Sequence, residues 1–209
     1  MRTLSWLLAS VLMAAAGRVV TFDNGQLGKT PPEWTVAMTN HGLAPRWEIL
    51  KDLSAATQPY VFAQVSADPV SDRFPLAVFN DVVFRDGEVS VRIKPVSGRE
   101  AQAGGLVWRY RDQNNYYLAR ANALQKNVQV FKVENGLRVP LMAAVRHEIP
   151  SNAWSILKVN ARGNRFQIYV DHRRILQGWD NAFLSPGKVG LWTVGDSVTY
   201  FDDFRVTPK

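Results

Sequence analysis

The fold is decided by residues 105–134, which read GLVWRYRDQNNYYLARANALQKNVQVFKVE. Apolar side chains recur at every second position in Gly105–Arg111, Asn115–Asn122 and Asn127–Glu134, and turn-forming residues separate these runs. A period of two is typical of a β-strand that buries one face, whereas a helix repeats every 3.6 residues. The stretch therefore predicts three antiparallel strands joined by tight turns.

The same pattern continues on both sides of this stretch. It predicts further strands at Val19–Asp23, Tyr60–Ser66, Glu88–Pro95, Trp154–Ala161, Arg165–Asp171, Lys188–Val194 and Val198–Val206. After residue 16 no stretch keeps a helical period, although a short helical turn is expected near Asp180–Leu184. Hairpin-linked strands favour an antiparallel meander over βαβ units. We predict an all-β protein, a two-sheet antiparallel β-sandwich of the jelly-roll type.

The first 16 residues have the layout of a secretory signal peptide. Arg2 precedes an apolar run, Leu4–Ala16, that ends in small residues. The run is shorter than the roughly 20 apolar residues of a membrane-spanning helix. We therefore expect residues 1–16 to be a leader and 17–209 a single domain, exported to the bacterial periplasm or medium without a membrane anchor. The chain has 0 Cys, so stability must come from the core and not from disulfides.

The positive charge of the chain is concentrated in its middle third. The formal net charge is +7, and most of it lies between Arg85 and Arg146. A local basic surface attracts anionic ligands. The expected partner is a saccharide or another polyanion, with nucleic acid not favoured. The alternative is that these residues are solvated strand faces.

Three segments carry a resemblance to a known family. They read AGGLVWRYRDQNNYYLARANALQKNVQVFKVENG at 103–136, RGNRFQIYVD at 162–171 and GKVGLWTVGDSVTYFDDFRV at 187–206. Together with FDNGQLGKTPPEW at 22–34, they resemble the laminin-G-like, concanavalin A-like lectin/glucanase superfamily. Within it, the chain is similar to a bacterial secreted branch of 3-keto-disaccharide hydrolase-like proteins. The resemblance implies two curved antiparallel sheets that hold ligands on the concave face or its rim.

No catalytic motif accompanies this resemblance. Glucanases of the superfamily carry a Glu-x-Asp-x-Glu pattern on a concave strand, because two carboxyl groups must flank the glycosidic bond. Asn115–Asn122 and Asn127–Val133 contain no Asp or Glu. His41, His147 and His172 lack the spacing of a zinc site. We therefore do not expect a glycosidase.

The resemblance also implies a structural calcium ion where the first and last strands meet. Asp23 would supply one ligand, and either Asp202 or Asp203 another, since consecutive strand residues point to opposite faces. The alternative is that these carboxylates are edge-strand charges.

Strand parity predicts which side chains share a face. In Glu88–Lys94 the apolar residues point inward and leave Arg92 and Lys94 outward; Leu106, Trp108 and Tyr110 are also expected inward. If the strands are neighbours, one sheet face carries Arg92, Lys94, Arg109, Arg111, Tyr116, Arg120, Asn122 and Gln129, with Trp192 as a further aromatic plane. Guanidinium groups would bind carboxylate or sulfate, and the rings would stack on sugar.

Two apolar residues, Leu118 and Phe131, point to the same face. They would be unusual in a solvent-filled groove, so they predict that another segment covers it. The leading hypothesis is a non-catalytic, lectin-like carbohydrate-binding domain whose basic face suits an anionic saccharide. A sugar-processing hydrolase and an adhesion module without a small ligand are the alternatives.

Overall fold

The computed structural model describes residues 17–209, so the leader predicted at 1–16 lies outside the described residues. In the described part every regular element is a strand, and none of its segments forms a helix that could span a membrane. The strands are β1 (Arg18–Val20), β2 (Trp34–Thr39), β3 (Trp47–Lys51), β4 (Tyr60–Gln64), β5 (Phe74–Phe84), β6 (Gly87–Ser97), β7 (Ala103–Asp112), β8 (Asn115–Asn122), β9 (Asn127–Glu134), β10 (Leu137–Pro140), β11 (Val145–Arg146), β12 (Ser155–Arg162), β13 (Arg165–Val170), β14 (Arg173–Trp179), β15 (Gly187–Trp192) and β16 (Val198–Pro208). The helical turn expected at Asp180–Leu184 is wrong, because this segment is an irregular connection.

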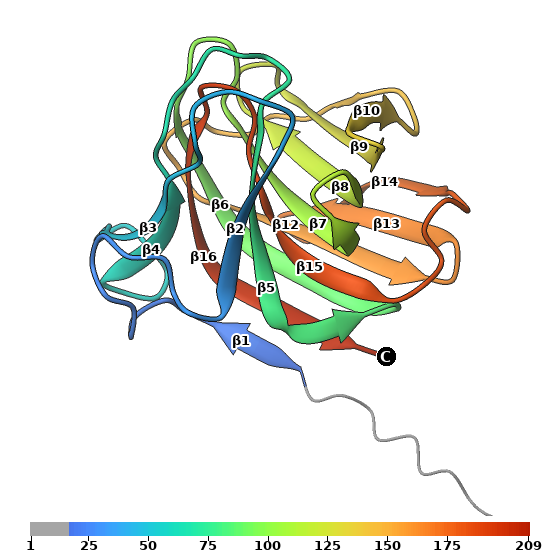
Figure 1. Cartoon of the computed structure of the whole chain (residues 1–209), viewed down its shortest axis with the longest axis horizontal. Coiled ribbons are helices and arrows are strands. Elements are labelled where there is room, and N and C mark those ends of the chain that lie inside the picture. Colours follow the sequence, from blue (N-terminus) through green and yellow to red (C-terminus); the bar gives the residue numbers. More distant parts are fainter. Residues whose placement is uncertain (1–16) are drawn as a thin grey trace, which may run out of the picture.

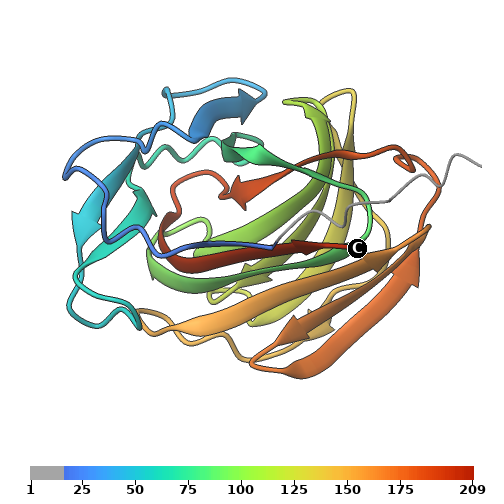
Figure 2. The same cartoon turned by 90° about the horizontal axis from the view of Figure 1, so that it is seen from below.

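The strands form two antiparallel sheets that face each other (Figures 1 and 2). Sheet A has the order β14-β13-β12-β6-β16-β4-β3, with β1 beside β16. Sheet B has the order β10-β9-β8-β7-β15-β5-β2, with β11 beside β9. The predicted two-sheet jelly-roll sandwich is confirmed.

The main core lies between the sheets and is rich in aromatic rings. Trp108 on β7 meets Phe166 on β13 edge to face, with ring centroids 5.8 Å apart. At the other end, Trp34 on β2 meets Phe204 on β16 at 5.0 Å. All four rings are buried. Burial of each large apolar side chain contributes roughly 2 kcal/mol, so these contacts hold the two layers together.

A second apolar cluster covers the outer face of sheet B. It includes Leu118 and Phe131, as well as Phe74, Tyr116 and Trp192, and all five are buried. Leu118 and Phe131 are therefore shielded from solvent, but the side chains that bury them come from sheet B, so the prediction that another segment covers this face stays a prediction. Two edges of sheet B itself help to bury this cluster: Arg138 on β10, whose guanidinium lies over the rings, and the end of β2, where Thr39 Oγ1 donates to the Gln113 carbonyl at 2.5 Å.

Sheet B curls around this second cluster. Arg138 on the edge strand β10 and Phe74 on β5 are five strands apart in the sheet order. In a flat sheet that separation would be about 24 Å. The Arg138 guanidinium nevertheless lies 4.7 Å from the centroid of the Phe74 ring, and a side chain alone cannot span the difference. The outer face of sheet B is therefore concave, and we call it the concave face.

Candidate functional site

Two arginines lie on the concave face of sheet B. Arg120 is on β8 and Arg138 is on β10, and β9 runs between them. Arg120 pairs in register with Gln129, and Arg138 pairs with Val133. Gln129 and Val133 lie on the same side of β9, because they are four residues apart on one strand. Register alone therefore directs both guanidinium groups to the concave face.

The two guanidinium groups pack on aromatic rings. The guanidinium carbon of Arg120 lies 5.2 Å from the centroid of the Phe131 ring. The Arg138 guanidinium lies over three rings, at 4.7 Å from Phe74, 5.1 Å from Phe131 and 5.8 Å from Trp192. Such cation–π contacts partly compensate a cation for lost water. They also leave the N–H groups at the edge of each guanidinium free to bind other acceptors.

Several donors on this face have no acceptor in the part of the chain that the structure describes. Arg120 Nη2 donates to Asn127 Oδ1 at 2.8 Å, but its Nε is buried and unpartnered. Arg138 Nη1 and Asn122 Nδ2 are also buried without a partner. A buried donor without an acceptor costs about 1–3 kcal/mol. The face therefore presents unmet N–H groups to any acceptor that reaches it.

The charge of the arginine pair is not neutralised by the protein. In residues 17–209 neither Arg120 nor Arg138 forms an ion pair with a carboxylate. Burial, and secondarily the charge of Arg138, lower the pKa of Arg120 to about 10. Burial also lowers the pKa of Arg138, with an opposing contribution from Asp72. Both groups stay cationic at neutral pH, so the face is electropositive and poorly hydrated.

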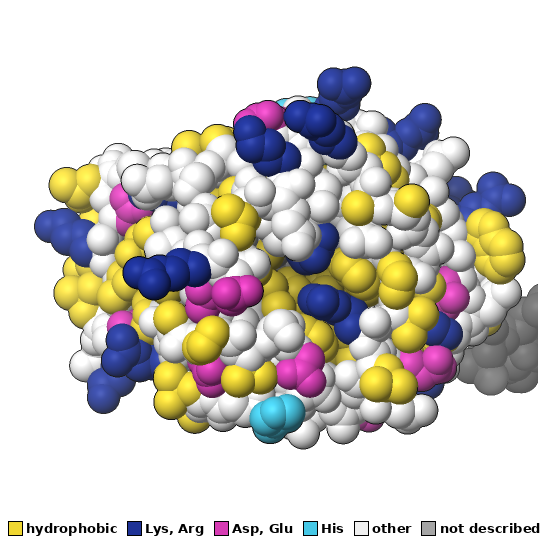
Figure 3. Space-filling view, turned by 90° about the horizontal axis from the view of Figure 1, so that it is seen from above, with side chains coloured by type: hydrophobic (Ala, Val, Ile, Leu, Met, Phe, Trp, Pro, Cys, Tyr) yellow, Lys and Arg dark blue, Asp and Glu magenta, His cyan; other side chains and the backbone are white. Residues whose placement is uncertain are grey.

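Tyrosines complete the rim of the concave face. The Tyr116 hydroxyl is 2.8 Å from Thr39 Oγ1, and burial raises the pKa of Tyr116, so this phenol stays neutral. Tyr110 is half-buried and stacks on Tyr116 with centroids 6.0 Å apart. Tyr110 therefore offers an accessible ring beside the arginines. Figure 3 shows Lys and Arg side chains set among hydrophobic ones in a hollow of the surface seen from above.

The sequence prediction for this face is right for some residues and wrong for others. Tyr116, Arg120, Asn122, Gln129 and Trp192 do share it, as strand parity predicted. The Tyr116 and Trp192 rings are completely buried, however, so the expectation that they stack on a sugar is wrong. Arg92 and Lys94 do not, because β6 lies in sheet A and is not a neighbour of β7 within a sheet. Both are engaged elsewhere, Arg92 Nε with Asp203 at 3.0 Å and Lys94 Nζ with Asp52 at 2.8 Å.

Arg109 and Arg111 are also absent from the concave face, because β7 has an irregular register between Trp108 and Asp112. Arg109 has a φ of 50°, and beyond it the faces of the strand are exchanged. Tyr110, expected inward, packs instead against the cluster of the concave face. Arg111 lies over the Phe183 ring, 4.8 Å from its centroid.

Arg109 is a structural residue at one end of the sandwich. Its guanidinium donates to the carbonyls of Arg85 and Phe183, each at 2.9 Å, and to the Gly163 carbonyl. It also pairs with Asp86 at 3.1 Å. The expectation of an exposed Arg109 is therefore wrong, since only 2% of its surface is exposed.

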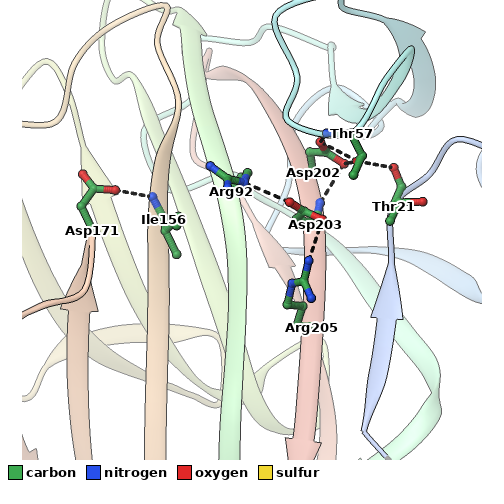
Figure 4. Close-up of polar contacts among 8 residues, drawn as sticks. All are labelled: Thr21, Thr57, Arg92, Ile156, Asp171, Asp202, Asp203 and Arg205. Carbon is green, nitrogen blue, oxygen red and sulfur yellow. Dashed lines mark hydrogen bonds and ion pairs between the residues drawn. The ribbon is translucent and has the colours of Figure 1, made fainter.

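The carboxylates predicted to bind calcium have separate partners in the structure, and Figure 4 shows those of Asp202 and Asp203. Asp202 accepts hydrogen bonds from Thr57 N and Oγ1, and Asp203 pairs with Arg92 and Arg205. Asp23 Oδ1 accepts from Tyr60 N at 3.4 Å. Within the described residues no three His, Asp or Glu side chains come close enough to hold a metal ion together. The calcium site stays a prediction.

Arg138 was missed by the sequence reasoning. The signal was available in principle: the turn at Asn135-Gly136 closes a hairpin, and counting back from it places Arg138 opposite Val133. What parity could not show is that the sheet curls enough to bring Arg138 over Phe74.

Comparisons with known proteins agree with this architecture. A scan against protein-family models finds no match. The chain is similar in structure to the carbohydrate-binding module CBM66 from Bacillus subtilis, with a TM-score of 0.64 and 26% identity, covering 84% of this chain and 96% of that one. It is also similar to Bacillus licheniformis β-glucanase, with a TM-score of 0.55 and 14% identity, covering 93% and 99%. The chain has the concanavalin A-like jelly-roll fold.

A sequence relative points in the same direction. The levanase of Bacillus subtilis (strain 168) is 37% identical over 117 residues, which is 56% of this chain. The matched region is only 16% of the length of that protein. The likeness therefore concerns one part of the levanase.

Proposed function

We propose that this protein is a carbohydrate-binding module that holds an acidic saccharide on the concave face of sheet B. The observation that carries the proposal is the pair of buried guanidinium groups, Arg120 and Arg138, with unmet N–H donors and no carboxylate partner in residues 17–209. A saccharide carboxylate or sulfate supplies both the charge and the acceptors that this face lacks.

The likeness to CBM66 supports the saccharide part of the proposal. Gln129 Nε2 donates to the Met142 carbonyl at 3.0 Å, whereas Gln129 Oε1 has only a 3.5 Å contact from Arg120 and suits a sugar hydroxyl. The Tyr110 ring suits a sugar plane. The proposed preference for an acidic saccharide rests on Arg120 and Arg138 alone. Export also belongs to the proposal, since a module of this kind meets polysaccharide outside the cell.

Binding is favoured over catalysis by the residues on this face. The outward positions of β8 and β9 are Tyr116, Leu118, Arg120 and Asn122, and Asn127, Gln129, Phe131 and Val133. A glycosidase needs two carboxyl groups at the bond that it cleaves. A hydrolase of the 3-keto-disaccharide type and an adhesion module are the alternatives, and no residue on this face specifically favours either.

The proposal is tested by calorimetric titration with trigalacturonate and with a neutral levan oligosaccharide. We expect trigalacturonate to bind and its affinity to fall as salt rises, because exposed ionic attraction is screened over about 10 Å at 0.1 M salt. Arg138→Gln should weaken binding about tenfold, equivalent to about 1.4 kcal/mol. Arg99→Gln is the matched control, because Arg99 is exposed in the loop between β6 and β7.

Each part of the proposal can fail separately. Equal affinity of the Arg138 and Arg99 variants would remove the concave face as the binding site. Equal affinity for the levan oligosaccharide and trigalacturonate would leave saccharide binding intact and overturn the preference for acidic sugars.

A further inference from the structure

The outer face of sheet A carries a second group of residues suited to a saccharide, at the edge made by β12, β13 and β14. These strands lie side by side at one end of the sheet (Figure 1). A hollow of about 520 Å³ lies here, away from the concave face of sheet B. Its lining includes Asn160, Arg162, Arg165, Gln167, Gln177 and Trp179.

Register arranges these six residues in two rows across the three strands. Arg162 pairs with Arg165, and Arg165 pairs with Trp179, which makes the first row. Asn160 pairs with Gln167, and Gln167 pairs with Gln177, which makes the second. Directly paired residues point to the same side of a sheet, and Ala161 and Phe166 between them are buried in the core. Both rows therefore face solvent.

Trp179 is unusually exposed for its size. Its surface is 68% accessible, whereas Trp34, Trp47, Trp108 and Trp192 are buried. Gly178, the residue before Trp179, packs closely against Met142 and Phe166. A Cβ at position 178 would lie 2.1 Å from Met142 Cε and 3.0 Å from the Phe166 ring. Glycine lets β14 pack this closely, and the next side chain is presented outward as a flat apolar plane.

The two arginines of the first row have no ion-pair partner within residues 17–209, and Asp86, which lies in an adjoining hollow with Arg162, is paired with Arg109. Arg162 and Arg165 face each other across the hairpin, and like charges directly opposite destabilise a strand pair. No Asp or Glu side chain lines the hollow, and within residues 17–209 neither arginine forms an ion pair. The nearby Glu88 is engaged by Asn160 at 3.1 Å and by Lys158 at 3.6 Å.

We propose that this surface, the Trp179 surface, is a second binding site, for an acidic oligosaccharide. The arginine pair matches sugar carboxylates, the amides of Gln167 and Gln177 match ring hydroxyls, and the indole matches the apolar face of a sugar ring. Two rows about 7 Å apart, each about 10 Å long, are the size of a few sugar units and not of a buried monosaccharide. An open surface of this kind suits sugar units in the middle of a polysaccharide, not only those at its end.

The Trp179 surface and the concave face could bind saccharide at the same time, because they lie on different sheets. The concave face belongs to sheet B, on the opposite side of the sandwich (Figure 2). One molecule with both sites occupied would bridge two saccharide chains, or two stretches of one chain. Linked sites raise the apparent affinity for a polymer without any new contact.

The test uses trigalacturonate titrated into protein that carries Arg138→Gln, so that the concave face contributes little. In this background we expect the remaining affinity to fall at least tenfold with Trp179→Ala and with Arg165→Gln. Arg99→Gln should leave it unchanged. Trp179 and Arg165 are exposed, so circular dichroism should show an unaltered fold for both variants.

The outcomes separate this site from the concave one. If Arg138→Gln has no effect but Trp179→Ala weakens binding, the concave face fails and the Trp179 surface stands. If Trp179→Ala and Arg165→Gln bind as well as their parent, the Trp179 surface is overturned. Tighter binding of a single-stranded oligonucleotide than of trigalacturonate, sensitive to the same two substitutions, would overturn the saccharide as its ligand.

Discussion

Arg120 and Arg138 share one aromatic ring: their guanidinium carbons lie 5.2 Å and 5.1 Å from the centroid of the Phe131 side chain. Two cations on one ring, with no carboxylate from residues 17–209 to neutralise them, repel each other in a poorly hydrated site. The fold tolerates this arrangement because the rings and the side-chain amide oxygen of Asn127 compensate part of the lost hydration. An anionic ligand would remove the remaining penalty.

Arg138→Met should stabilise the free protein. Methionine keeps the apolar contacts with Phe74 and Trp192 but removes a desolvated charge and an unpartnered donor. We expect the free energy of unfolding in urea to rise by about 1 kcal/mol. A gain of this size is common when a residue that serves binding is replaced by one that serves stability. With saturating trigalacturonate the order should reverse. A less stable variant without ligand would show that the cation–π contacts outweigh desolvation.

Arg109→Ala should destabilise the protein without a selective effect on saccharide binding. The substitution removes four contacts, to Arg85, Phe183, Gly163 and Asp86, and takes this donor away from the buried Phe183 carbonyl and from three part-buried oxygens. We expect a loss of about 3 kcal/mol in urea unfolding. At a temperature where the variant is folded, its affinity for trigalacturonate should match that of wild type. A selective loss of affinity would place Arg109 at the binding site after all.

Asp202→Asn should change the pH dependence of stability. Burial raises the pKa of Asp202 above its ordinary value, and in residues 17–209 this carboxylate has hydrogen-bond donors but no ion pair. Because folding favours the protonated form, the stability that Asp202 contributes at low pH is lost as pH rises through its folded pKa. Asparagine cannot ionise. The variant should therefore gain on wild type in urea unfolding as pH rises from 4 toward neutrality; parallel pH profiles would contradict this.

The calcium prediction can be tested by melting the protein with EDTA and with added calcium. An ion held by Asp23 and Asp203 would have to compete with Arg92 and Arg205 for the Asp203 carboxylate. If it binds, calcium should raise the melting temperature and EDTA should lower it, since a ligand of the native state stabilises it by mass action. Identical melting curves would show that the protein does not bind calcium.

The alternation of side chains along the chain was sufficient to predict much of the fold. The strand near Asn115–Asn122 was placed with the right residues on each face, because an undistorted strand has a strict period of two. Leu118 and Phe131 predicted a covered face for the same reason. The positions of Arg120, Asn122 and Gln129 on the concave face therefore follow from the alternation of side chains along two neighbouring strands.

Only the tertiary structure decided the rest. Assignment of β6 to sheet A separates Arg92 from Arg120, and strand partners depend on packing between distant segments, which no local pattern records. A single irregularity in β7 turned Arg109 and Arg111 away, because β7 has one extra residue opposite β15 at this point and such a bulge exchanges the faces of a strand. The curl of sheet B placed Arg138 over Phe74. The sequence by itself determined strands and their faces, whereas long-range pairing and curvature determined which faces meet.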